Sequence, residues 1–287
     1  MTRGRWIALI VAVVLVAVTG TASAVWVTRS KSASPVQPSL PGSMASAGDS
    51  ITRAFDLDGR HFLQDSPEES WASGTDPAVN SHYVRLVAAN PTIAGKVYND
   101  ARVGAKMEAL RGQLAMAAAQ QVDYLTILMG ANDLCTTSVA AMTPTATFEA
   151  QFDQALAGFL GADRGAHVLV SSIPDVFRLW DALHTNPLAQ ITWNLVHICP
   201  SMLSAGATDA ERQQVVAQEQ ADNAALASVC RRYDRCRFDG NAVFNVSFAA
   251  ADVSSVDYFH PSLSGQKNLA AVTWAAGYWP AGPPVKR

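Results

Sequence analysis

Short apolar segments alternate with amphipathic ones along most of this chain. Two of the apolar segments, Tyr124–Met129 and His167–Ser171, show little polar alternation, which is typical of strands buried on both faces of a parallel sheet. Two shorter segments, Met44–Ala47 and Lys96–Tyr98, predict further strands. The pattern therefore predicts a parallel sheet whose faces are covered by the segments between the strands.

Helical spacing fills the segments between these strands. Apolar side chains recur every three or four residues at 107–114 and at 148–159. A capping box formed by Thr208 and Glu211 predicts the start of another helix, and a last one is expected over Ser264–Ala276. Alternating strands and helices predict an α/β fold, a three-layer α/β/α sandwich with a central parallel sheet.

The N-terminus has the features of a targeting segment. Two arginines precede an unbroken apolar run from Trp6 to Val18, and Ala22-Ser23-Ala24 is typical of a signal-peptide cleavage site. Continued to Val27, the apolar stretch is about 22 residues long, which is enough to span a bilayer with the body outside. Residues 1–29 are thus a cleaved signal peptide or a transmembrane anchor, and either places the body outside the cytosol.

A linker separates this segment from the body. Residues 30–43 are rich in serine and proline, a composition typical of linkers. The folded domain is expected to cover residues 44–287, a length that suits one α/β domain.

The composition excludes two classes of protein. The chain is 49% hydrophobic and 16% charged, so it has enough apolar side chains for a core and too few charges for a disordered protein. Its 24 acidic residues outnumber the 21 basic ones, and the first 31 residues contain four of the basic residues and no acidic one. The body is therefore acidic and lacks the positive surface that binds nucleic acid.

All four cysteines lie in the predicted exported body: Cys135, Cys199, Cys230 and Cys236. In an oxidising compartment an even number of cysteines indicates disulfides, here two with three possible pairings. Closeness in sequence favours a bond between Cys230 and Cys236, which leaves Cys135 for Cys199. Zinc binding is the alternative, and the lack of a Cys-x-x-Cys pair in the sequence disfavours it.

Residue types that suit acyl transfer follow the predicted strands. The first strand leads into Gly48-Asp49-Ser50, although this tripeptide by itself is equally typical of a turn or a helix cap. Gly104 follows the second strand, where a glycine lets a backbone N–H approach a ligand. The third strand leads into Gly130-Ala131-Asn132-Asp133, whose Asn132 can present a side-chain N–H, with an ordinary turn as the alternative.

An acid and a histidine lie three residues apart near the C-terminus, in Asp257-Tyr258-Phe259-His260. In a turn, the Asp257 carboxylate can accept from Nδ1–H of His260 and leave Nε2 free as a base. The other histidines lack an acid at this spacing in a comparable context, and His82 and His167 are expected to be structural.

Parallel strands end at one edge of a sheet, so these groups are expected to meet there. Together they supply a hydroxyl, a base, an orienting acid and donors for an oxyanion, the parts that an acyl-transfer site needs.

The four segments resemble the sequence blocks of the SGNH (GDSL-type) hydrolases. The blocks extend from Gly48 to Pro261, across nearly the whole body. Ser70-Trp71-Ala72-Ser73-Gly74 and Asn132-Asp133-Leu134-Cys135 further resemble segments of the phospholipase B-type branch and of secreted actinobacterial lipases and esterases. One departure is Ala54, where many members have glycine four residues after the nucleophile.

The resemblance implies a flavodoxin-like fold and ester hydrolysis through an acyl-serine. It makes Ser50 the nucleophile, His260 the base and Asp257 its partner. The oxyanion hole is then formed by the backbone N–H groups of Ser50 and Gly104 and by the Asn132 side chain. This chemistry needs neither a metal nor a cofactor.

The sequence thus predicts an extracytoplasmic serine ester hydrolase, of the carboxylesterase or lipase kind, that acts on a small-molecule or lipid ester. Nucleic acid is not expected as a partner, and membrane contact is expected through the N-terminal segment if it is not cleaved. The alternatives are a carbohydrate O-acetyl esterase or acyltransferase on the same fold, or a non-catalytic extracellular binding module. Such a module has no need of Ser50, Asp257 and His260 together.

An apolar stretch before Met202 predicts one more helix. Asn186 and Pro187 are typical of a helix start, as cap and first residue. Apolar side chains follow at spacings of three, four and three, at Leu188, Ile191, Leu195 and Ile198. This spacing favours a helix with one face packed on the sheet. The alternative is that Trp180, Trp193 and their neighbours line or cover a pocket for an acyl chain.

Overall fold

A computed structural model describes residues 37–162 and 165–280 of the chain. The predicted targeting segment and the first part of the linker lie outside these residues, and the unit described below begins at Gln37. Within the described ranges, no helix is both long and apolar enough to cross a membrane. The end of the predicted linker contacts the C-terminal segment, where Trp279 Nε1 donates to the Pro38 carbonyl at 3.0 Å. The domain boundary at residue 44 stays a prediction.

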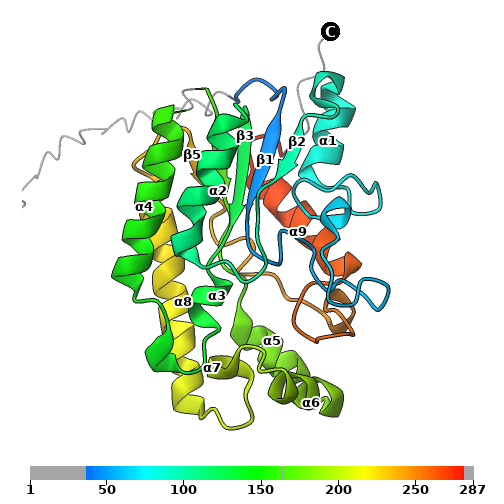
Figure 1. The fold of residues 1–287 in the computed structure, drawn as a ribbon, viewed down its shortest axis with the longest axis vertical. Helices are drawn as coiled ribbons and strands as arrows, with labels where there is room; N and C mark the ends of the chain where they lie inside the picture. Colours follow the sequence, from blue (N-terminus) through cyan, green and yellow to red (C-terminus); the bar gives the residue numbers. More distant parts are fainter. Residues whose placement is uncertain (1–36, 163–164, 281–287) are drawn as a thin grey trace, which may run out of the picture. The chain divides into compact units, whose positions relative to one another are not determined.

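Five parallel strands form the central sheet in the described part of the chain (Figure 1). They are ordered β2-β1-β3-β4-β5, with bounds β1 Met44–Gly48, β2 Val97–Asn99, β3 Tyr124–Leu128, β4 His167–Val170 and β5 Cys236–Phe238. After β1 the chain forms β2 on one side of β1, and it then crosses to the other side to form β3. The direction of winding therefore reverses between β1 and β3. In open α/β sheets, ligands bind at the carboxyl ends of the strands at such a reversal point.

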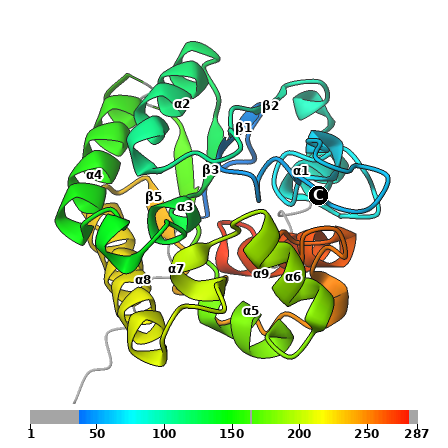
Figure 2. The same ribbon diagram turned by 60° about the horizontal axis from the view of Figure 1, so that its bottom comes forward.

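Helices cover both faces of the sheet, which confirms the predicted α/β/α sandwich (Figures 1 and 2). One face is covered by α2 (Met107–Ala119), α4 (Thr145–Ala162) and α8 (Asp209–Cys230), and the other by α1 (His82–Ala89) and α9 (Leu263–Ala276). Shorter helices lie near the carboxyl ends of the strands: α3 (Ala131–Leu134), α5 (Val176–Leu183), α6 (Pro187–Leu195) and α7 (Pro200–Leu203). Single 3₁₀ turns are η1 (Pro67–Glu69), η2 (Pro91–Ile93), η3 (Val139–Ala141) and η4 (Ala250–Asp252).

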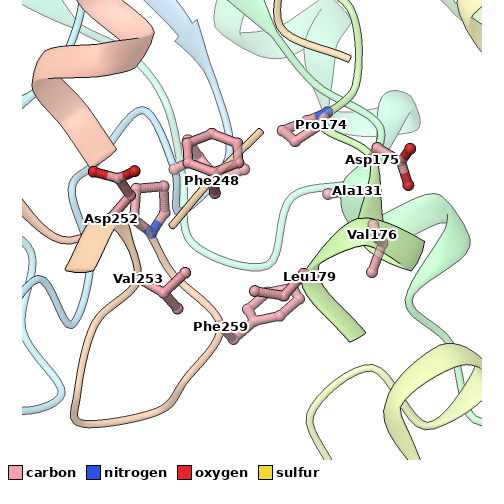
Figure 3. A pocket seen from close by; sticks show the side chains of 11 residues that line it. Ala131, Pro174, Asp175, Val176, Leu179, Phe248, Asp252, Val253 and Phe259 are labelled. Carbon is pink, nitrogen blue, oxygen red and sulfur yellow. The ribbon is translucent and has the colours of Figure 1, made fainter. Parts of the chain in front are cut away.

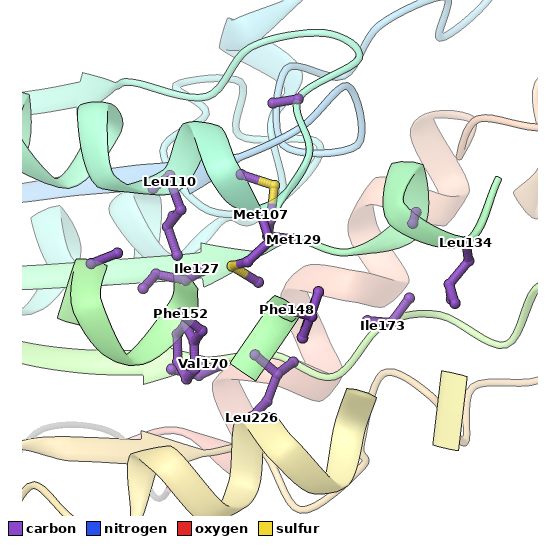
Figure 4. Packing of buried hydrophobic residues seen from close by; sticks show 14 of the residues in the cluster. Met107, Leu110, Ile127, Met129, Leu134, Phe148, Phe152, Val170, Ile173 and Leu226 are labelled. Carbon is purple, nitrogen blue, oxygen red and sulfur yellow. The ribbon is translucent and has the colours of Figure 1, made fainter. Parts of the chain in front are cut away.

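Successive strand residues feed two separate cores because their side chains point to opposite faces. Ile127 and Val170 pack with Phe148, Phe152 and Leu226 from α4 and α8 (Figure 4). The neighbouring strand positions form the opposite core with α1, α9 and the C-terminal segment, through Met44, Tyr124, Leu169, Trp274 and Trp279. The strands are therefore covered on both faces, as their continuous apolar sequence predicts.

His82 belongs to this second core. It is fully buried, and its Nδ1 and Nε2 lie 3.0 Å from the Tyr124 hydroxyl and 2.8 Å from Thr273 Oγ1. Burial lowers its pKa to about 3, so the ring stays neutral. His82 thus joins α1 to β3 and α9, which confirms its predicted structural role.

The predicted strands and helices are present, but one helix ends early, and strand β5 and the short helices α1, α3, α5 and α7 were not predicted. The four predicted strands are present with ends shifted by one residue at most, and the capping box of α8 is formed. Strand β5 was not predicted, because its three residues are too few to show a pattern. Helix α6 starts at Pro187 with Asn186 as its N-cap, as predicted. It ends at Leu195, before Ile198.

The predicted buried face of α6 is wrong. Leu188, Ile191 and Leu195 are 60%, 61% and 75% exposed, whereas Ala189 and Trp193 on the other side are buried. The helix lies beyond the strand ends and does not cover the sheet (Figure 2). The helix makes its inner contacts through the indole of Trp193. The apolar side chains on its outer side therefore have no sheet to pack against.

Both disulfides favoured by the sequence are present, and the zinc alternative is wrong. Cys230 and Cys236 join the end of α8 to β5. Cys135 and Cys199 join the segment after α3 to the segment after α6. The second bond ties the exposed helix α6 to the loop that follows β3.

We expect Gln113→Ala to destabilise the end of β1. The Gln113 side chain is buried, accepts from the Gly48 N–H at 2.7 Å and donates to the Gly48 carbonyl at 2.9 Å. That carbonyl also accepts from Arg102, so alanine leaves mainly the buried Gly48 N–H without a partner. The free energy of unfolding in urea should fall by about 1–3 kcal/mol. Arg111→Ala on the exposed side of α2 is the control, and equal loss in both variants would contradict the role of Gln113.

Candidate active site

The turn after β1 places Ser50 at the carboxyl edge of the sheet. Gly48 has a φ of +154°, and a Cβ there would lie 2.4 Å from the Leu128 carbonyl, so only glycine fits. The carboxylate of Asp49 is buried and accepts from the Ile51 N–H at 2.9 Å, which closes the turn on itself. Ser50 is held between these two contacts and is 5% exposed.

The predicted nucleophile, base and acid meet across 210 residues of sequence. His260 Nε2 lies 2.7 Å from Ser50 Oγ, and His260 Nδ1 lies 2.5 Å from Asp257 Oδ2. The other carboxylate oxygen of Asp257 accepts from the backbone N–H of Phe259 at 2.8 Å and of His260 at 3.0 Å. Both carboxylate oxygens of Asp257 are therefore hydrogen-bonded, which fixes the orientation of the carboxylate toward the imidazole.

The electrostatics keep the acid beside the imidazole charged. Burial alone would raise the pKa of Asp257, but hydrogen bonds and the charge of His260 outweigh it and hold that pKa below its ordinary value of 3.8. The ionised carboxylate accepts a hydrogen bond from Nδ1–H of His260 and leaves Nε2 to accept one from the hydroxyl. Such an arrangement can draw a proton from Ser50.

The loops on either side of β1 carry the predicted oxyanion donors. Gly104, after β2, has a φ of +73°, and no atom lies within 4 Å of where its Cβ would be. Asn132, in the first turn of α3 after β3, donates from Nδ2 to the Ala105 carbonyl at 3.1 Å. Its neighbour Asp133 accepts from the Met107 N–H at 2.9 Å. These two bonds hold the loops after β2 and β3 together.

Ala54 occupies the position where the resemblance expects glycine. It has a φ of +49°, a left-handed conformation that costs a non-glycine residue about 1–2 kcal/mol. The backbone conformation that favours glycine is thus retained here with alanine, whose side chain is fully buried.

A second buried acid lies beside the Asp–His pair and carries no sequence signal. Asp56 is 2% exposed and accepts from the Leu63 N–H at 2.7 Å. Burial raises its pKa, and the neighbouring charge of Asp257 raises it further. Its carbonyl accepts from Ser254 Oγ at 2.6 Å, which links the turn after β1 to the loop before Asp257.

Trp193 supports the same loop from α6. Its Nε1 donates to the Tyr258 carbonyl at 3.1 Å, and Tyr258 has a φ of +57° between Asp257 and His260. The sequence left open that Trp180 and Trp193 line or cover an acyl pocket; neither is among the residues that line the cavity next to Ile51 and Pro261. Trp180 instead stacks on His184 at 4.4 Å.

The chain belongs to the GDSL-like lipase/acylhydrolase family, whose model matches residues 46–267. This range contains all five predicted site residues. The protein is accordingly a hydrolase of ester bonds, and the alternative of a non-catalytic binding module loses its support.

Two solved structures of low identity share the fold, and a third is similar at a lower TM-score. An α/β hydrolase from the metagenome of Lake Arreo, Spain, is 17% identical with a TM-score of 0.50, over 82% of this chain and 94% of that one. The acetyl xylan esterase AlAXEase is 12% identical with a TM-score of 0.50, over 81% and 98%. An extracellular lipase from Streptomyces rimosus is 18% identical with a TM-score of 0.48, over 82% and 99%. No curated protein sequence matches the chain.

We expect Asp49→Asn to change the pH dependence of stability. Burial raises the pKa of Asp49 from 3.8 to about 7. Between these values the folded state keeps a proton that the unfolded chain releases, so the free energy of unfolding falls as pH rises from about 4 to about 7. We measure the free energy of unfolding in urea at both ends of this pH range. Its fall should be smaller in the variant than in wild type by about 1–3 kcal/mol. Asp209→Asn, on an exposed side chain, should keep the wild-type slope. A wild-type slope in Asp49→Asn as well would contradict the prediction.

We expect Trp193→Phe to slow ester hydrolysis roughly five-fold, which is the loss of about one hydrogen bond in positioning His260. Phenylalanine keeps the buried ring but removes the donor to Tyr258. The measurement is kcat/KM on an aryl ester, with Trp180→Phe as control. An unchanged kcat/KM would show that this hydrogen bond does not position the loop.

Proposed function

We propose that this protein hydrolyses carboxylic esters outside the cytosol through an acyl-Ser50 intermediate. The observation that carries the proposal is the continuous contact from Ser50 Oγ through both nitrogens of His260 to Asp257. The three groups come from two distant segments and are each less than 10% exposed. A hydroxyl with a neutral imidazole and an ionised acid behind it is the constellation of serine hydrolases.

Acylation transfers one proton. His260 Nε2 takes the Ser50 proton as Oγ forms a bond to the ester carbonyl carbon. The negative charge on the carbonyl oxygen is then stabilised by the N–H groups of Ser50, Gly104 and Asn132. When the bond to the alcohol oxygen breaks, His260 donates the proton to that oxygen and the alcohol leaves.

Deacylation repeats the sequence with water. His260 Nε2 takes a proton from water as the water oxygen attacks the acyl carbon. The bond to Oγ breaks, the proton returns to Oγ, and the carboxylic acid leaves. Asp257 stays ionised throughout and stabilises the imidazolium that forms in each step.

The location outside the cytosol is supported by the two disulfides, which persist in oxidising compartments and are rare in the cytosol. The apolar N-terminal segment of the sequence agrees with export.

Ser50→Ala should leave the fold intact and lower kcat on an aryl acetate roughly 10³-fold or more. A fluorophosphonate should modify wild type at Ser50 and fail to modify the variant. Ser171→Ala is a matched control, because Ser171 is also buried and its hydroxyl has no hydrogen-bonding partner among the residues described. Near-normal turnover by Ser50→Ala would overturn the proposed function.

A further inference from the structure

A cavity lies between α5 and the chain segments around Phe248 and Phe259, and several of its lining residues are sequence neighbours of the proposed catalytic groups (Figure 3). Its inner wall is formed by chain neighbours of those groups. Ile51 follows the nucleophile, Ala131 precedes Asn132, and Pro261 follows the histidine. A group bound covalently to Ser50 would thus have this cavity next to it.

The outer wall closes the cavity with apolar side chains. Val176 and Leu179 from α5 face Phe248 and Val253, which come from the loop that precedes the Asp–His pair (Figure 3). Leu179 lies close to Phe259 in the same view. Of the eleven lining residues, nine are apolar and two are acidic.

The two acids are already engaged. Asp252 accepts from the Ala249 N–H at 3.0 Å and from Ser264 Oγ at 2.6 Å. Asp175 caps α5 at the Arg178 N–H and pairs with the Arg178 guanidinium at 3.1 Å. The lining contains no basic side chain. Hydrocarbon is therefore accepted by this wall, whereas an anionic group would be desolvated beside two carboxylates, with the guanidinium of Arg178 already paired with Asp175.

The cavity is small. The centres of water-sized atoms fit within about 50 Å³ of it. This space for atom centres exceeds the roughly 10–15 Å³ of a single water-sized sphere, so the cavity has room for a short chain of atoms. A short acyl group such as acetyl or butyryl fits this space.

The chemistry of the two steps decides which half of the ester lies there. The alcohol must leave toward solvent after acylation, and water must then enter on the same side. The acyl group is bonded to Ser50 from the end of the first step until the second, so an apolar space near Ser50 suits the acyl group. We propose that the cavity closed by Leu179 and Phe248 is the acyl pocket, and that it selects short, uncharged acyl groups. The proposal rests on the proposed function of Ser50.

The test is kcat/KM on p-nitrophenyl esters with acyl groups of two to twelve carbons and on a monosuccinyl ester. Wild type should prefer acyl groups in the range from acetyl through butyryl. Its kcat/KM on the octanoyl and succinyl esters should be lower roughly ten-fold or more. Leu179→Ala should raise the octanoyl-to-acetyl ratio roughly ten-fold. Leu179→Phe should lower butyryl hydrolysis more than acetyl hydrolysis, which keeps the test valid if the alanine variant folds poorly.

Leu188→Ala is the matched control, because it removes the same atoms from an exposed leucine outside the cavity. It should keep the wild-type ratio. A second series keeps the acetyl group and varies the alcohol, where Leu179→Ala should have little effect. Fastest wild-type turnover on octanoyl or longer esters, an unchanged ratio in both Leu179 variants, or an effect confined to the alcohol series would overturn the acyl-pocket assignment.

Fluorophosphonate labelling separates the two proposals. If Ser50 is labelled while chain-length preference ignores Leu179, the pocket is wrongly assigned and the proposed function stands. If Ser50 is not labelled and Ser50→Ala still hydrolyses the acetyl ester, the proposed function itself fails.

Discussion

The parallel pairing of β1 with β3 is the constraint on which the rest of the site depends. The two strands run in register to their last residues, where Gly48 lies opposite Leu128. The chain must therefore turn sharply at that point, and the φ of Gly48 makes the turn possible. Ser50 and Asn132 follow these two strand ends, so one pairing places the proposed nucleophile and a proposed oxyanion donor at the same edge.

The remaining groups are brought to this edge by long-range contacts. His260 reaches Ser50 from the connection before α9, and its loop is held by Trp193 from α6 and by Asp56 through Ser254. The disulfide of Cys135 with Cys199 joins α6 back to the segment after α3. The loop containing His260, the proposed base, and the segment after Asn132 are thus connected through one short helix, whose outer face is apolar and exposed.

Much of this arrangement was predictable because its signals are local. Continuous apolar strands, capped helices and the four short blocks around Ser50, Gly104, Asn132 and His260 are readable without knowledge of the fold. Strand β5 and the buried face of α6 were not. A three-residue strand shows no period, and the spacing of Leu188, Ile191 and Leu195 gives a helix face without saying whether anything packs against it.

The sequence by itself determined the fold class, the order of the site residues and the most favoured pairing of the cysteines, because each follows from residue type and spacing. Only the tertiary structure decided the contacts that join distant segments. These are the second acid at Asp56, the indole donor of Trp193, and the cavity closed by Leu179 and Phe248. Their positions depend on how loops pack beyond the ends of the strands, and no periodic pattern in the chain encodes that packing.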